Sequence, residues 1–359
     1  MNPSDASRRS TAKFIFDGVD ITTSVQSNLL SVTYTDNEED ETDDLQIRLQ
    51  DRDGIWLEKW LNDAVESAVS SDGLKNQLKI QAIFTQKNWY GNGGEASLDC
   101  GVFELDSIDA RGPPAVIAIK ATSLPYSGQF RQTKKSKAWE NLPLSAIAAE
   151  MAAENGMVCM YESANNPSYK RVEQYKESDI AFLSSLCHDA GISLKVTNQI
   201  IVLFDQSTYE RKSTVATIAR GDGKYTKYKL STGTADAEYA SCRVSYADPG
   251  TGECIEGVAK VEDYNADAKN NQQLEITAKV ASVGEAKALA EKMLRLHNKF
   301  AKTASFTLHG DPSLVAGVTV MLEKWGAWNG KYIVRQAKHT IDGSGYTVQV
   351  KLRKVLEGY

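Results

Sequence analysis

The strongest constraint on the fold of this chain is the strict alternation of apolar and polar residues in short segments. Leu45, Ile47 and Leu49 are separated by polar residues, so a strand at residues 45–50 would place its apolar side chains on one face. Similar segments rich in β-branched and aromatic residues recur along the chain. They predict further strands at residues 14–16, 29–35, 78–84, 100–108, 116–120, 192–196, 200–204, 237–246, 274–280, 304–308, 318–322, 332–341 and 346–352. The chain is therefore expected to fold mainly into β-sheets.

Four segments instead carry apolar residues at helical spacing, at residues 53–72, 143–156, 178–191 and 282–300. Their boundary signals are, in chain order, Asp53 and Gly73, Pro143 and Gly156, Ser178 and Gly191, and the capping box Ser282–Glu285. Their expected buried stripes are Leu57, Trp60, Leu61, Ala64, Val65 and Ala68; Leu144, Ile147, Ala148 and Met151; Phe182, Leu183, Leu186 and Cys187; and Ala286, Leu289, Ala290, Met293, His297 and Phe300.

The order of these elements divides the chain into three parts. Residues 1–124 and residues 207–359 are each rich in strands with one embedded helix, whereas residues 125–206 combine two helices with a hairpin. No sequence repeat connects the two strand-rich parts. We predict an α+β fold, mainly β, with three domains at these boundaries.

Two segments concentrate charge. Residues 36–44 contain almost only acidic side chains, and such a segment is expected to be a solvated hairpin loop. It does not match a calcium-binding loop, because Glu41 replaces the glycine at the sixth position and Ile47 the glutamate at the twelfth. The densest basic segment contains Arg131, Lys134, Lys135 and Lys137, and it too is predicted to be a solvated loop.

The composition narrows the possible classes of protein. Hydrophobic residues make up 42% and charged residues 25%, which is enough for an ordinary core. The formal net charge of -6 argues against a protein that binds duplex nucleic acid, although an acidic average can hide a local basic patch. No apolar segment of signal-peptide length follows residues 1–11, and no run approaches the roughly 18 residues that a membrane span needs. We therefore expect synthesis and folding in the cytoplasm.

The residues that could carry chemistry form no recognisable motif. Cysteines stand at five scattered positions, which predicts free thiols, and Cys187 falls on an apolar helix face, where packing is its expected role. The four histidines, His188, His297, His309 and His339, show no metal-ligand spacing. Residues 10–13 match SxxK but lack the accompanying elements, and no P-loop, GxSxG or GxGxxG motif is present. We assign no catalytic, cofactor-binding or metal-binding residue.

Three short patches, spread over nearly the whole chain, point to a family. They are residues 43–47 (DDLQI) with 51–56 (DRDGIW); residues 174–183 (QYKESDIAFL) with Gly191 and the following hairpin; and residues 314–318 (LVAGV), 330–334 (GKYIV) and 345–348 (GYTV) with His339. In this order they resemble the phage late control gene D family, the baseplate hub proteins of contractile phage tails and of phage-tail-like particles (tailocins).

The resemblance implies a homotrimer in which each chain contributes two tube-protein-like β-barrel domains, each with an embedded helix, on either side of a small α+β domain. The resulting pseudo-six-fold ring would join the hexameric tail tube protein to the three-fold spike protein. Other baseplate subunits would surround it, and the tape-measure protein is a further candidate partner. The resemblance implies no enzymatic activity, no sequence-specific nucleic acid and no membrane span. The protein would be made in the bacterial host cytoplasm and incorporated in a virion tail baseplate or tailocin particle.

Because Tyr359 follows the last predicted strand closely, we expect the spike to be a separate protein.

The composition leaves two other functions open. The abundant carboxylates and the helical middle part are also compatible with a peptidoglycan hydrolase or a cell-wall-binding module of the tail tip. A tail-tube or adaptor protein of the same assembly is a third possibility.

Overall fold

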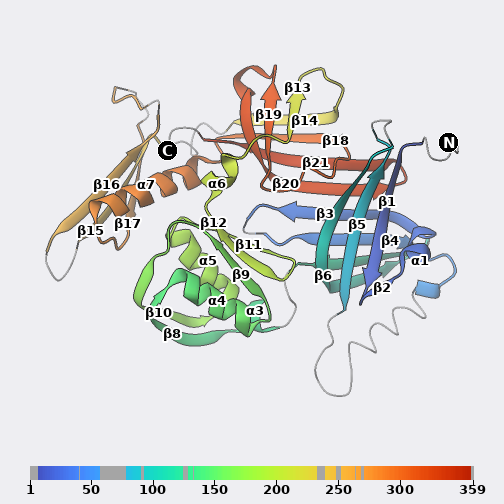
Figure 1. The fold of residues 1–359 in the computed structure, drawn as a ribbon, viewed down its shortest axis with the longest axis horizontal. Helices are drawn as coiled ribbons and strands as arrows, with labels where there is room; N and C mark the ends of the chain where they lie inside the picture. Colours follow the sequence, from blue (N-terminus) through green and yellow to red (C-terminus); the bar gives the residue numbers. More distant parts are fainter. Residues whose placement is uncertain are drawn as a thin grey trace.

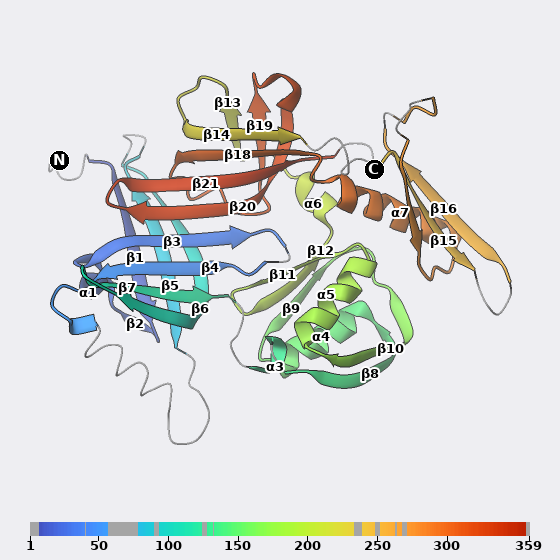
Figure 2. The same cartoon turned by 180° about the vertical axis from the view of Figure 1, so that it is seen from behind.

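The structure is a computed structural model that describes residues 7–39, 41–56, 78–89, 93–123, 128–131, 133–232, 239–247, 252–262, 264–267 and 271–356. The predicted helix that starts near Asp53 falls almost entirely outside these residues. The described part is mostly β, as the alternation predicted, and Figures 1 and 2 show one large sheet beside two smaller units.

The large sheet contains 13 strands. They are β1 (Arg9–Phe16), β2 (Val19–Asp20), β3 (Leu29–Asn37), β4 (Asp44–Gln50), β5 (Lys79–Lys87), β6 (Glu95–Arg111), β7 (Val116–Thr122), β13 (Ala216–Ala219), β14 (Tyr225–Thr232), β18 (Lys302–His309), β19 (Thr319–Glu323), β20 (Gly330–Asp342) and β21 (Gly345–Lys354). Their order is β14-β18-β21-β20-β3-β4-β7-β6-β5-β1-β2, and β19 pairs with both β20 and β13. Helix α1 (Thr22–Gln26) follows β2, and a 3-10 turn, η3 (Gly326–Trp328), precedes β20.

One pairing joins the two ends of the chain. β20 and β3 are antiparallel neighbours, with Gln336 opposite Asn37 and Asp342 opposite Ser31. The two strand-rich parts therefore share one sheet, and among the described residues the hydrogen-bonded path closes no barrel. The two β-barrel domains that the family resemblance implies are therefore not confirmed within this chain.

The middle part is a compact α+β unit. It contains α3 (Gly128–Arg131), β8 (Lys135–Pro143), α4 (Leu144–Glu154), β9 (Val158–Glu162), β10 (Ser168–Glu177), α5 (Asp179–Asp189), β11 (Ser193–Thr197), β12 (Ile200–Phe204) and α6 (Gln206–Glu210). Both predicted helices and the β11–β12 hairpin are confirmed, and Ser178 caps α5 by accepting a hydrogen bond from the Ala181 N–H. The predicted stripes of α4 and α5 lie in one core. The β8–β10 pair and the parallel β9–β12 pair were not predicted.

Part of the last segment forms a unit of its own. β15 (Ser241–Ala247), β16 (Cys254–Lys260) and β17 (Gln273–Thr277) form a separate sheet with a core against α7 (Val283–Asn298). The strands predicted at 237–246 and 274–280 therefore lie in a separate small sheet, whereas the prediction placed them with the other strands of residues 207–359. Ser282 accepts a hydrogen bond from the Glu285 N–H at the start of α7, as predicted, and the Glu285 carboxylate accepts one from the N–H of Ala281 rather than of Ser282. A Cβ atom at Gly257 would overlap the backbone of α7, which explains glycine at this close approach.

Candidate structural site: a buried charge cluster

The acidic turn around the β3–β4 connection, of which the structure describes residues 36–39 and 41–44, forms hydrogen bonds and ion pairs with distant parts of the chain. Asp36, Glu38 and Asp43 are only 4%, 3% and 0% exposed. The prediction of a solvated loop is therefore wrong for these residues. Burial of so many carboxylates is tolerated because cations from distant parts of the chain pair with them and offset their loss of hydration.

The first connection is made by Arg353 of β21, which is completely buried. Its Nη2 donates to Glu38 Oε1 at 2.8 Å, its Nε donates to Glu38 Oε2 at 3.2 Å, and its Nη1 donates to Glu210 Oε1 at 2.5 Å. Arg295 of α7 pairs with the other oxygen of Glu210. Burial raises the pKa of Glu38 and outweighs the lowering by Arg353. Two helices and the last strand thus meet at one turn.

The second connection is made by Glu39. Its carboxylate pairs with Lys299, just after α7, and accepts hydrogen bonds from Ser193 Oγ at 2.6 Å and from the Gln206 side chain. Burial alone would raise the pKa of Glu39, but Lys299 and the Ser193 hydrogen bond outweigh burial and lower that pKa below its usual value. Glu39 is therefore held as a carboxylate between the middle unit and α7.

The third connection is made by Lys195 of β11. Its Nζ lies 2.6 Å from Asp36 Oδ1 and 3.6 Å from Asp43 Oδ2. The second oxygen of Asp36 accepts a hydrogen bond from the Ala316 N–H at 2.8 Å. Burial raises the pKa of Asp43 to about 7, opposed by Lys195 and reinforced by Asp36. The ion pairs of Lys195 thus connect the middle unit to the two ends of the acidic turn.

These groups form what we call the buried charge cluster: Asp36, Glu38, Glu39, Asp43, Lys195, Glu210, Arg295, Lys299 and Arg353. The acidic turn contributes its carboxylates, and the cations come from the middle unit, the region of α7 and the last strand. The arrangement is suited to holding three parts of the chain in fixed positions.

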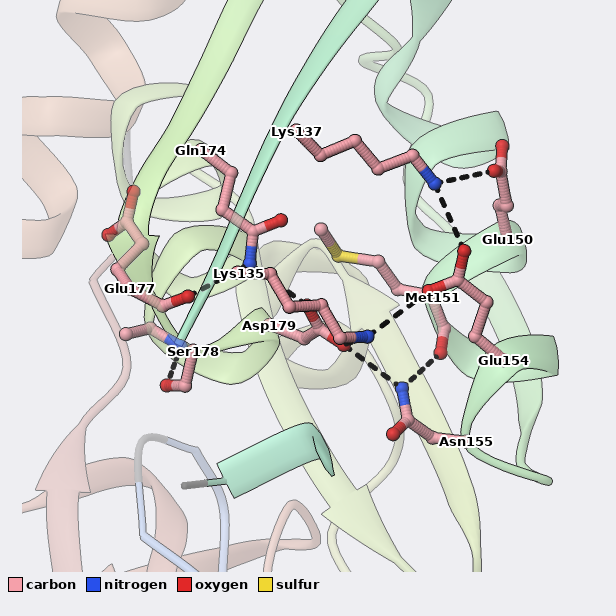
Figure 3. A network of polar contacts seen from close by, with 11 residues as sticks. Lys135, Lys137, Glu150, Met151, Glu154, Asn155, Gln174, Glu177, Ser178 and Asp179 are labelled. Atoms are coloured by element: carbon pink, nitrogen blue, oxygen red, sulfur yellow. Dashed lines mark hydrogen bonds and ion pairs between the residues drawn. The ribbon is translucent and has the colours of Figure 1, made fainter. Parts of the chain in front are cut away.

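The predicted basic loop is also structured, and Figure 3 shows its contacts. Lys135 and Lys137 lie in β8 and form ion pairs with α4 and α5, so the solvated-loop prediction is wrong for them. Lys135 Nζ lies 2.7 Å from Asp179 and 3.2 Å from Glu154, and Lys137 Nζ lies 3.0 Å from Glu154. Gln174 donates to Asp179 at 2.9 Å, which brings together two residues of the QYKESDIAFL patch.

The four histidines lie in three different places in the structure. His339 is buried and hydrogen-bonded to the Tyr346 hydroxyl and the Leu314 carbonyl, and burial lowers its pKa to about 4. His188 and His297, which are distant in sequence, line one cavity of about 220 Å³ between α5 and α7. His309 is exposed beside Trp89. Within the described residues, no three His, Cys, Asp or Glu side chains gather as metal ligands.

The five cysteines form no disulfide in the structure, and Cys187 is buried in the core of the middle unit, where packing was its predicted role. No helix in the described ranges has the length and apolar character needed to cross a membrane.

Comparisons with known proteins identify relatives. Residues 117–345 match the model of the phage tail baseplate hub family (GPD). The probable baseplate hub protein of Escherichia phage P2 is 27% identical over 215 residues, which are 58% of this chain and 50% of that protein. The probable baseplate hub protein of Escherichia phage 186 is 28% identical over 179 residues, 49% of this chain and 40% of that protein. The match thus spans half or less of these relatives.

Solved structures share the fold at low sequence identity. A tail protein from Neisseria meningitidis has a TM-score of 0.67 at 10% identity, with 96% of both chains covered. A 43 kDa tail protein of prophage MuSo2 from Shewanella oneidensis has a TM-score of 0.64 at 10% identity, covering 96% of this chain and 97% of that one. An E. coli component of the type VI secretion system has a TM-score of 0.52 at 10% identity, covering 92% and 75%.

Proposed function

Because this chain belongs to the phage tail baseplate hub family, we propose that it is a structural subunit of a tail baseplate hub in a contractile phage tail or tailocin. The match of residues 117–345 to the family model is the observation that carries the proposal. It agrees with the resemblance seen in the sequence. The buried charge cluster supports the same role, since it fixes the relative positions of the parts of the chain that a rigid connector must hold together.

The proposed assembly is a homotrimeric ring. The large sheet ends at β14 on one side and at β1 and β2 on the other. Along most of β14, only one edge is hydrogen-bonded among the described residues, and an open edge is a template for pairing with another chain. The open sheet of one subunit would be completed by its neighbours, so that the two strand-rich parts of three chains build a pseudo-six-fold ring.

The ring would seat a hexameric tube protein on one side and a three-fold spike protein on the other, within the virion tail or tailocin. We propose three domains, at residues 1–124, 125–206 and 207–359. Strands β15–β17 and helix α7 form a subdomain of the third domain. We propose no enzymatic role. In-gel zymography on purified peptidoglycan is expected to show no clearing, and a lytic band from this chain alone would favour the hydrolase function instead.

Co-assembly tests the function. Mass photometry of the full chain should show a species of about three times the 39.4 kDa chain mass. Mixing with the tube and spike proteins of the same particle should shift this species to higher mass. A chain that stays monomeric and associates with neither protein would contradict the proposal.

A further inference from the structure

The large sheet has two unlike faces. One face packs into two hydrophobic cores. Val32, Leu45 and Ile119 belong to the first core, and Phe306 and Val350 belong to the second. The opposite face points away from β1 and β5. In Figure 2 β18, β21, β20, β3 and β4 lie side by side with no element drawn in front of them. Most of this sheet face is therefore uncovered in the single chain; it is covered at the end where Asn37 and Arg353 are buried.

The strand register places polar side chains across this face. From β14 toward β3, one row runs through Lys227, Thr307, Gln349, Lys338 and Thr35. The adjacent row runs through Lys229, Ser305, Lys351, Gln336 and Asn37. Hydroxyl and amide groups thus fill the space between lysines.

We call Lys227, Lys229, Lys338 and Lys351 the lysine patch. All four side chains belong to exposed residues, and none forms an ion pair with any described residue. Neighbouring strands are about 4.8 Å apart, so Lys229 and Lys351 stand roughly 10 Å apart and Lys227 and Lys338 roughly 14 Å apart. On a chain with a formal net charge of -6, this is a concentrated group of free cations.

We propose that the lysine patch binds the phosphate backbone of nucleic acid without reading its sequence. Lysine ammonium groups and Ser, Thr and Gln side chains are common donors to phosphate oxygens. The face is built of strands side by side and presents no helix that could enter a major groove, so the contacts would be to the backbone alone. This inference goes beyond the hub function and does not depend on it.

The lysine patch is not the basic segment that the sequence indicates. In the basic segment Arg131–Lys137, Lys135 and Lys137 are engaged in ion pairs, whereas the free cations come from β14 and from the hairpin of β20 and β21, which lies much later in the sequence. Only the pairing of β14, β18, β21 and β20 brings them together.

Fluorescence anisotropy with a labelled 30-base-pair duplex of random sequence tests the proposal. For the wild-type full chain, the logarithm of the binding constant should fall linearly with the logarithm of salt concentration between about 50 and 200 mM. The variant K227Q/K229Q/K338Q/K351Q should bind at least about tenfold more weakly at low salt, and its salt slope should be smaller by about three to four.

A matched variant, K134Q/K170Q/K279Q/K287Q, removes the same charge from exposed lysines outside this face and should keep the wild-type slope. Thermal melts of both variants should coincide with wild type, which separates binding from folding. Equal weakening in both variants, or no measurable binding at 50 mM salt, would overturn the proposal. Equally tight, patch-dependent binding of poly-glutamate would also overturn it, in favour of an acidic protein partner.

Discussion

Replacing Arg353 by methionine is the sharpest perturbation of the buried charge cluster. Methionine fills much of the same volume but removes the cation that pairs with Glu38 and Glu210. Three hydrogen bonds to these two carboxylates are lost in a site where Arg353 is completely buried. Removing one partner of a buried ion pair typically costs about 3–5 kcal/mol, because the other charge stays buried and unpaired.

The loss should depend on pH. Burial already raises the pKa of Glu38, and without Arg353 that pKa must rise further. A carboxyl group whose pKa is higher in the folded state destabilises the protein as pH rises through the folded-state pKa. The variant should therefore lose more stability at pH 8 than at pH 5, where Glu38 can take up a proton.

Urea unfolding followed by circular dichroism at both pH values measures this effect. The double variant E38M/R353M should recover part of the loss, since it buries no unpaired carboxylate at position 38. Arg48→Met, at an exposed position of β4, is the control and should change stability by less than about 0.5 kcal/mol. A loss below about 1 kcal/mol for R353M at pH 8 would refute the reasoning that this ion pair holds the turn.

Three further predictions concern packing and titration. Phe182→Asp should unfold the middle unit, because an unpaired carboxylate would enter its core, whereas Tyr175→Asp, at an exposed position, should leave the thermal melt of this unit near that of wild type. Gly257→Ala should displace α7 and speed its cleavage in limited proteolysis, whereas Gly343→Ala, where no atom lies near the new Cβ, should not. Asp43 has a folded-state pKa of about 7, above its usual 3.8, so its contribution to stability should fall as pH rises from 4 to 7. Asp43→Asn should flatten that part of the curve of urea midpoint against pH, and an unchanged slope would contradict the assignment.

Local features of the fold could be predicted from the sequence because their causes are local. Ser178 and Ser282 cap the helices that they were expected to cap, and the apolar spacing of α4 and α5 identified their buried faces. The hairpin at residues 193–204 follows from two apolar segments around a short polar turn, where Asn198 and Gln199 adopt positive φ.

The features that the sequence did not predict depend on contacts between residues that are far apart in the chain. The acidic turn looks solvated when only its neighbours in sequence are considered, yet its cations stand at positions 195, 299 and 353. The pairing of β20 with β3 spans some 300 residues, and alternation carries no information about it. The lysine patch was missed for the same reason.

Electron microscopy of the purified full chain tests the central claim most directly. If the open sheet is completed by neighbouring copies, class averages should show closed rings of three subunits around a hollow axis, with six similar lobes from the two strand-rich parts of each chain. Isolated monomers, or rings built from six copies of this chain, would contradict the account of a trimeric hub.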